Sequence, residues 1–127
     1  MTGLLDTHTF IWWDSDVSRL SSKVLEFLGD ASNMVLLSVV SVWEMVIKMQ
    51  LEKITIRAPL TAIIADQQAN GMQVLPVTLA HVLTVETLPI PHKDPFDRLL
   101  VAQANAEGAV LLSADLVFAQ YPVNILW

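Results

Sequence analysis

The sequence predicts an α/β fold, a three-layer α/β/α sandwich around a mainly parallel central sheet. Short apolar runs of strand length alternate along the chain with segments whose apolar residues recur at helical spacing. The runs "MVLLS" (34–38) and "AVLLS" (109–113) are apolar up to a final serine, which is typical of strands covered on both faces. A chain of 127 residues can bury its own core, so we place one domain at residues 1–127.

The first elements follow from local patterns. The run "GLLD" (3–6) predicts a strand, and "THTFIWW" (7–13) predicts a helix. A second helix is expected over Val17–Leu28, with Ser18 as its cap and Gly29 as its stop.

The run at 34–38 predicts a strand that leads directly into a helix. The apolar residues of this helix recur at the spacing of one buried face: Val39, Val42, Trp43, Val46 and Ile47. The polar residues Ser41, Glu44 and Lys48 are expected on its other face.

The second half of the chain continues the alternation of helices and strands. Proline and glycine mark most of the boundaries. The expected elements are a helix from Pro59 to Ala69, a strand over 72–77, a helical segment from Thr78 to near Pro89, a helix from Pro95 to about Glu107, a strand over 109–113, a short helix over 114–121 and a strand over 123–127. The helix at 95–107 is expected to bury Phe96, Leu99, Leu100 and Ala104, and to end at Gly108.

The composition excludes several classes of protein. Apolar residues make up 54% of the chain, but the longest uncharged stretch near the middle, 31–43, is too short to span a bilayer. The N-terminus "MTGLLDTHTF" lacks the pattern of a signal peptide, so we expect a cytoplasmic protein with no membrane contact. The absence of cysteine excludes disulfides, thiolate zinc sites and a cysteine nucleophile.

Charge constrains the ligands that the protein can bind. Thirteen acidic and seven basic residues give a net charge of −6, which by itself argues against binding a polyphosphate. The argument weakens if several of the acids share divalent cations.

Acidic residues follow the predicted strands at one edge of the sheet. Asp6 ends the first strand, Asp115 lies just beyond the strand at 109–113, and Asp94 and Asp97 begin the helix before that strand. Glu44 lies early in the helix after strand 34–38. Because the carboxyl ends of parallel strands converge, these carboxylates should share one pocket. An oxygen-only pocket suits Mg²⁺ or Mn²⁺ and metal-assisted hydrolysis of a phosphodiester, by one ion or two.

Each of these acids also has a structural interpretation. Asp6, Asp94 and Asp115 can cap the helices that follow them, with Pro95 at the first helical position after Asp94. Glu44 can complete a capping box with Ser41 or pair with Lys48. Their joint placement favours a shared site, because independent capping has no reason to select converging strand ends.

Two other functions stay open from the residues alone. A phosphomonoester hydrolase could use a strand-end aspartate as nucleophile, although "DTHT" lacks a second acid two residues on. A non-catalytic acidic binding module would use the acids only as caps or as ligands of a structural ion.

Four blocks of the chain carry a resemblance to a known family: "LLDTHTFIWW", "LLSVVSVWEMVIK", "HKDPFDRLLVAQA" and "LLSADLVFAQYPVNILW". Together they resemble PIN-domain proteins, specifically the bacterial VapC-like toxin branch with its H-x-DPFDR element. The resemblance implies a Mg²⁺- or Mn²⁺-dependent endoribonuclease that acts on RNA. It also implies the toxin of a type II toxin–antitoxin pair, whose small antitoxin blocks the site. The apolar surface expected from the composition would serve that antitoxin or a homodimer.

The resemblance also assigns roles to residues. It implies that Asp6, Asp97 and Asp115 bind the metal, directly or through water, and that Glu44 binds metal or orients the attacking water. Asp94 is expected to cap its helix with a possible supporting part in the site. Residues that could orient carboxylates or contact phosphate are Thr7, Ser113, His8, His92, Lys48, Lys93 and Arg98. His81 is expected on a helix surface, and the tryptophans in the core or a dimer interface rather than in a base-stacking platform.

Overall fold

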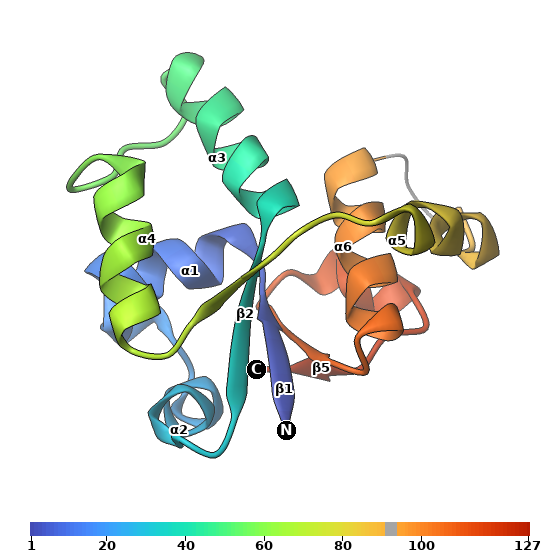
Figure 1. Cartoon of the computed structure of the whole chain (residues 1–127), viewed down its shortest axis with the longest axis horizontal. Coiled ribbons are helices and arrows are strands. Elements are labelled where there is room, and N and C mark those ends of the chain that lie inside the picture. The colour runs from blue at the N-terminus through green and yellow to red at the C-terminus, as the bar shows by residue number, and fades with distance from the viewer. Residues whose placement is uncertain (91–93) are drawn as a thin grey trace.

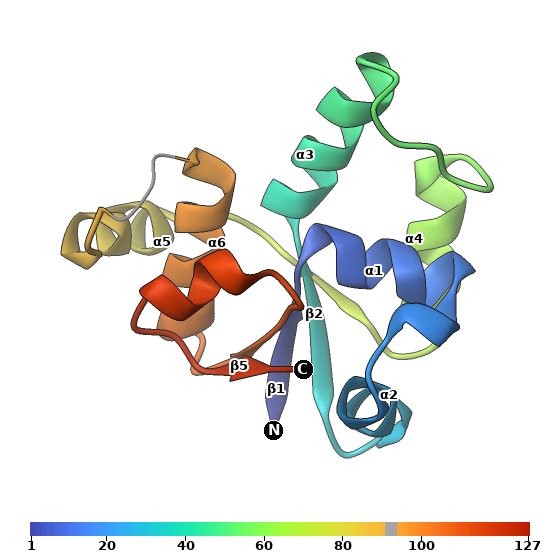
Figure 2. The ribbon, with the colours of Figure 1, turned by 180° about the vertical axis from the view of Figure 1, so that it is seen from behind.

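A computed structural model describes residues 1–90 and 94–127 as a parallel sheet flanked by helices (Figures 1 and 2). The strands are β1 (Thr2–Leu5), β2 (Met34–Ser38), β3 (Gln73–Leu75), β4 (Val110–Leu112) and β5 (Ile125–Leu126). The α-helices are α1 (Thr7–Ser15), α2 (Ser22–Gly29), α3 (Val39–Gln50), α4 (Leu60–Ala69), α5 (Leu79–Thr84) and α6 (Pro95–Ala106). Short 3-10 helices are η1 (Val17–Arg19), η2 (Val85–Thr87) and η3 (Leu116–Gln120).

The sheet has five strands in the order β3-β2-β1-β4-β5, and its neighbouring strands all pair in parallel. Strand β1 lies in the middle, where Leu5 is in register with Leu37 of β2 and Leu112 of β4. All three strands therefore end at the same level. This confirms the predicted α/β/α fold and places the residues after β1, β2 and β4 at one edge of the sheet.

Alternate residues of the central strands enter two different cores. Leu4, Leu36 and Leu111 pack in the core that is closed by α6, η3 and the segment before α6. Their neighbours Leu5, Leu37 and Leu112 pack against α1, α2, α3 and α4 on the other face. Figure 1 shows α1, α2 and α4 on one side of β1 and β2, with α5 and α6 on the other.

Gly3 is the point of closest approach between the sheet and helix α2. A Cβ atom built on Gly3 would lie 2.6 and 2.8 Å from two ring carbons of Phe27 and 3.1 Å from a methyl carbon of Leu112. The central strand therefore requires glycine here, because a side chain would meet a buried aromatic ring.

Helix α3 buries a different face from the one predicted. Its buried residues are Val40, Ser41 and Met45, whereas Val39, Trp43 and Val46 are exposed, Trp43 by 60%. Ser38, the last residue of β2, caps the helix through Val40 N at 3.0 Å, and the helix packs against α1 and α6. The exposed residues, which we call the α3 stripe (Val39, Trp43 and Val46), are spaced as one helix face.

The predicted helix over Val17–Leu28 is divided in the structure. Val17–Arg19 form the 3-10 helix η1, and α2 begins after Ser21, whose hydroxyl accepts from Val24 N at 3.2 Å. The expected cap at Ser18 is wrong, because the Ser18 hydroxyl donates to Asp16 Oδ1 at 2.6 Å instead. The stop at Gly29 is confirmed.

The remaining helices and strands lie close to their predicted ranges. Gly71 and Gly108, which follow α4 and α6, have φ values of +95° and +62°, where glycine is favoured. Within residues 1–90 and 94–127, no helix is long and apolar enough to cross a bilayer.

Candidate active site

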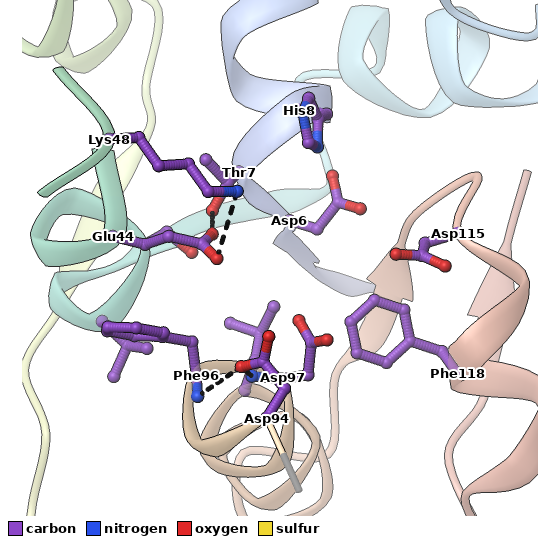
Figure 3. Close-up of a pocket in the computed structure, with 13 residues that line it drawn as sticks. Asp6, Thr7, His8, Glu44, Lys48, Asp94, Phe96, Asp97, Asp115 and Phe118 are labelled. Atoms are coloured by element: carbon purple, nitrogen blue, oxygen red, sulfur yellow. Dashed lines mark hydrogen bonds and ion pairs between the residues drawn. The ribbon is translucent and has the colours of Figure 1, made fainter. Parts of the chain in front are cut away.

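A polar pocket of about 120 Å³ lies at the carboxyl edge of the central strands (Figure 3). Its acidic lining residues are Asp6, Glu44, Asp94, Asp97 and Asp115. It is also lined by Thr7, His8, Ser41, Lys48, Phe96 and Phe118, together with the aliphatic residues Val40 and Leu100. The structure thus brings together four acids from four separate segments of the chain, and the cap Asp94 with them. Their metal-binding and catalytic roles stay predictions.

Asp6 is the most deeply buried acid of the pocket. It leaves β1, caps α1 by accepting from Thr9 N at 2.8 Å, and is 8% exposed. Burial raises the pKa of the Asp6 carboxyl above its ordinary value, and hydrogen bonds from Ser113 and Thr9 offset part of that rise. The ionised form of Asp6 is therefore disfavoured unless positive charge comes close to it.

Ser113 joins the end of β1 to the end of β4. Its hydroxyl donates to Asp6 Oδ2 and accepts from Asp115 N at 3.0 Å. Asp115 in turn caps η3 by accepting from Val117 N at 3.0 Å, so the predicted capping role is confirmed. Thr9 adds a second link, since its hydroxyl donates to Leu112 O at 2.9 Å. These bonds hold Asp6 and Asp115 in a fixed relation.

Glu44 is held from two directions. Its Oε1 accepts from the Thr7 hydroxyl at 2.5 Å, and its Oε2 lies 3.5 Å from Lys48 Nζ. The pair with Lys48 was one of the two structural interpretations. The other, a capping box with Ser41, is wrong because α3 starts earlier, at Val39, and Ser41 lies inside the helix.

Asp94 and Asp97 enter the pocket from the start of α6. Asp94 Oδ1 accepts from Phe96 N at 2.9 Å and from Asp97 N at 3.2 Å, with Pro95 at the first helical position. The predicted cap is therefore confirmed. Asp97 follows one turn into the helix, where it lines the pocket (Figure 3).

Some of the predicted substrate contacts lie elsewhere or outside the described residues. Arg98 donates to Pro89 O at 2.6 Å and to the Tyr121 hydroxyl at 3.4 Å, and it lines a different surface hollow. The expected contact of Arg98 with the site or with Asp94 is therefore replaced by a link to the segment before α6. His92 and Lys93 lie outside the described residues.

His81, which we expected on a helix surface, is 2% exposed. Its ring completes a capping box with Thr78, and Nε2 lies 3.1 Å from Glu107 Oε2. Its Nδ1 lies 3.3 Å from Gln103 Nε2. The expectation was wrong because these partners come from α6, which local sequence around His81 does not reveal.

Sequence reasoning did not single out the aromatic walls of the pocket. Phe96 lies between Asp94 and Asp97 in the chain, and Phe118 lies three residues after Asp115. The signal was present in the sequence, since Phe96 is next to Asp97 and Phe118 lies about one helical turn after Asp115. Phe96 was expected only as part of the core, and Phe118 was given no role.

The donor atoms of this pocket suit a hard divalent cation. Each acidic residue of the pocket offers carboxylate oxygens, the donor atoms that Mg²⁺ and Mn²⁺ prefer. In the part of the chain that the structure describes, no group of three or more histidine and acidic side chains is arranged to hold an ion as it stands. The carboxylates of Asp6 and Glu44 are bonded to hydroxyls, a backbone amide and an ammonium instead. The chemistry of the donors therefore fits, and binding would exchange some of these bonds.

A parallel α/β/α sandwich with carboxylates clustered at the strand ends places this protein in the class of α/β proteins with an acidic pocket at the carboxyl edge of the sheet. Residues 3–124 match the PIN domain family, and the chain belongs to that family. The resemblance found in the sequence is thereby confirmed. Over 115 residues the chain is 28% identical to the ribonuclease VapC22 of Mycobacterium tuberculosis, covering 90% of this chain and 87% of that protein.

Solved structures of VapBC proteins share the fold. VapBC2 from Rickettsia felis, bound to a DNA fragment from its promoter, matches with a TM-score of 0.72 at 17% identity, covering 100% of this chain and 98% of that one. DNA-bound VapBC from Salmonella typhimurium matches with a TM-score of 0.68 at 16% identity, covering 100% and 97%. VapBC-1 from nontypeable Haemophilus influenzae matches with a TM-score of 0.56 at 17% identity, covering 94% and 91%.

Proposed function

We propose that this protein is a Mg²⁺- or Mn²⁺-dependent endoribonuclease and the toxin of a type II toxin–antitoxin pair. The observation that carries the proposal is the meeting of Asp6, Glu44, Asp97 and Asp115 in one pocket of a PIN-domain fold. The relative named ribonuclease VapC22 supports RNA as the substrate. The reaction is hydrolysis of a phosphodiester bond by water.

In this proposal Asp6, Asp97 and Asp115 hold the divalent cation. A bound cation would lower the pKa of a coordinated water and offset the negative charge of the phosphate. Ionised Asp6 needs such a positive charge, because burial otherwise favours its protonated form.

The protein's own residues orient the reactants. Ser113 and Thr9 fix the two oxygens of Asp6, so that its carboxylate faces the pocket in one orientation. Thr7 and Lys48 fix Glu44, and in this proposal Glu44 accepts the proton of an attacking water. Lys48 adds a positive charge that can lie beside the phosphate.

The central experiment measures cleavage of RNA by the purified protein with Mg²⁺, with Mn²⁺ and with chelator. We expect cleavage only with metal, and a loss of at least about a hundredfold in Asp6→Asn and Asp97→Asn, the scale of a lost catalytic group. The matched control is Asp66→Asn, because Asp66 is 58% exposed and pairs with Arg57 away from the pocket. Cleavage by the two site variants at the rate of the unmodified protein would assign the activity to a contaminant or another site.

Exposed apolar surface beside the pocket supports a protein partner. The ring of Trp43, in the α3 stripe, packs edge-on at 5.1 Å against Phe96, which lines the pocket. An antitoxin segment that covers the α3 stripe would lie at the pocket entrance and block it. The VapBC structures with the same fold are consistent with such a pairing.

A second apolar surface lies on α5, η2 and the start of α6. It surrounds a hollow of about 560 Å³ lined by residues that include Val82, Leu83, Leu88, Ile90 and Leu99. Leu83 is 52% exposed and Ile90 is 73% exposed. We assign this surface to the homodimer contact, since exposed apolar patches of this kind mark protein interfaces.

A further inference from the structure

A second hollow adjoins the acidic pocket and has a different character. It is about 240 Å³ in volume and is lined by Asp6, His8, Trp12, Ala114 and Asp115. Three of these residues, Asp6, His8 and Asp115, also line the acidic pocket. The two spaces are therefore neighbours that share a wall, and a ligand in one can extend into the other.

Trp12 is the largest side chain of this hollow and is held in place by its neighbours. Its ring centroid lies 5.8 Å from that of His8 and 5.9 Å from that of Trp127, which meets it edge-on. The guanidinium carbon of Arg19 lies 4.9 Å from the Trp12 ring centroid. A ring fixed in this way loses little freedom when a ligand packs on it.

A positive charge lies beside Trp12, whereas the rest of this edge of the sheet is acidic. The chain carries a net charge of −6, and the acidic pocket concentrates negative charge beside the hollow. Arg19 is exposed and stacked on Trp12, and His8 is exposed at the wall between the two spaces. A flat, electron-rich ring with a cation beside it is the arrangement that binds a base and its backbone in single strands.

We propose that this hollow binds one nucleobase of the RNA, that of a nucleotide next to the phosphodiester held in the acidic pocket. The base stacks against Trp12, His8 forms the wall between base and phosphate, and Asp115 offers an acceptor to the base edge. This inference rests on the proposed ribonuclease function and adds the substrate position that it recognises. Trp12 is a substrate-binding residue in this scheme and takes no part in the chemistry at the phosphate.

A nucleobase suits the hollow better than an apolar side chain of a protein partner. The lining surface is mainly apolar and is edged by two carboxylates and a histidine, so the hollow offers both a flat apolar face and polar groups. An aliphatic side chain would cover the Asp6 and Asp115 carboxylates without offering either of them a hydrogen-bond donor, which favours a ligand that carries donors. A base carries both an aromatic face for Trp12 and N–H donors for the carboxylates.

The test combines removal of a base from the RNA with removal of the Trp12 ring from the protein. A short RNA is prepared intact and with an abasic nucleotide at each position in turn, and kcat/KM is measured for the unmodified protein and for Trp12→Leu. At one position beside the cleaved bond, we expect the abasic change to lower kcat/KM about tenfold with Trp12 present and less than about twofold without it, the scale of one stacked base.

Three variants separate stacking from damage to the fold. Trp12→Phe keeps an aromatic face and should retain most of the effect of the base. Leu51→Ala removes an exposed apolar side chain that lines neither the hollow nor the acidic pocket, and the abasic penalty should be unchanged. Thermal unfolding of each variant shows that Trp12→Leu is folded under the assay conditions.

A binding measurement keeps this inference distinct from the ribonuclease proposal. The same RNAs are bound to Asp97→Asn and to Asp97→Asn with Trp12→Leu, and Kd is read from fluorescence anisotropy. Removal of the base and removal of the ring could have coupled effects on Kd while the unmodified protein cleaves no RNA. This result would support the base site and overturn the nuclease function. Cleavage without coupling at any position would overturn the base site alone. Loss of partner-protein binding in Trp12→Leu, again without coupling to a base, would assign the hollow to a protein instead.

Discussion

The residue that best shows the conflict between stability and function is Asp6. Its carboxylate is buried among groups that orient it, yet burial favours the protonated form. A carboxyl whose pKa is raised on folding binds its proton more tightly in the folded state. The free energy of unfolding therefore falls as pH rises from the ordinary aspartate pKa through the raised one.

This reasoning predicts the behaviour of Asp6→Asn without metal. Asparagine keeps the helix cap, because its carbonyl can still accept from Thr9 N, and it removes the buried charge. We expect the variant to be at least as stable as the unmodified protein at pH 7, and to lose the decrease in stability above the ordinary aspartate pKa. Chemical denaturation from pH 4 to pH 8 checks this. A variant markedly less stable at pH 7 would show that the ionised carboxylate stabilises the fold.

Ser113 should matter through Asp6 and Asp115 rather than through the substrate. Ser113→Ala removes a buried hydroxyl that bonds to both residues, so we expect about 1–2 kcal/mol lower stability, the scale of a lost buried hydrogen bond. We also expect kcat to fall more than KM rises, since Asp6 loses its fixed orientation. Ser18→Ala, at an exposed serine that bonds only to Asp16, is the matched control. Equal effects of the two changes would refute a role for Ser113 in the site.

At the scale of elements, the start of α6 separates capping from chemistry. Asp94 bonds to two backbone amides of the helix, whereas Asp97 lines the pocket one turn later. Asp94→Ala should lower stability by about 1 kcal/mol, the typical value for a lost cap. Asp97→Asn should keep the fold and lose cleavage and metal binding. Unfolding and cleavage assays on both variants give the comparison, and the reverse pattern would exchange the two roles.

The contact of β1 with α2 gives a prediction about packing. Gly3→Ala places a methyl group within 2.6–2.8 Å of the Phe27 ring, which is itself buried. Overpacking of this kind lowers stability by about 1–3 kcal/mol. The control is Gly29→Ala, because nothing lies within 4 Å of a Cβ at that position. Urea denaturation compares the two, and an unaffected Gly3→Ala protein would mean that α2 moves away freely.

Local rules predicted helix starts better than helix faces. The caps at Asp6, Asp94 and Asp115 were found because a side chain and the amides two or three residues on decide them. The buried face of α3 was missed because the helix has apolar residues on two sides, and packing against the neighbouring helices decides which side is buried. Arg98 was missed for a similar reason, since the carbonyl that holds it lies nine residues earlier.

For the whole molecule, the sheet order explains why the site could be predicted at all. Strands β2, β1 and β4 lie side by side and end in register, so the residues that follow them meet at one edge. The strand runs and their terminal acids were visible in the sequence. The sequence did not reveal the hollow at Trp12, because it depends on where α1 and the segment after β4 come together.

Metal binding should stabilise the whole protein. A cation that binds only the folded state adds about 2.7 kcal/mol at a concentration one hundred times its Kd. We expect Mn²⁺ to raise the unfolding temperature of the unmodified protein and to give a measurable heat of binding by calorimetry. Asp115→Asn should weaken both effects, whereas Asp66→Asn, outside the pocket, should not. Equal responses of the two variants would place the metal away from this pocket.

The hydroxyl of Ser113 joins two residues, Asp6 and Asp115, that are far apart in the chain, with a separation of 107 positions between Ser113 and Asp6. During synthesis, β1 and β2 leave the ribosome well before β4 can pair with β1. Until the segment with Ser113 has emerged, Asp6 has Thr9 as a partner but lacks the Ser113 hydroxyl. The orientation of Asp6 by Ser113 therefore forms only after β4 has paired with β1.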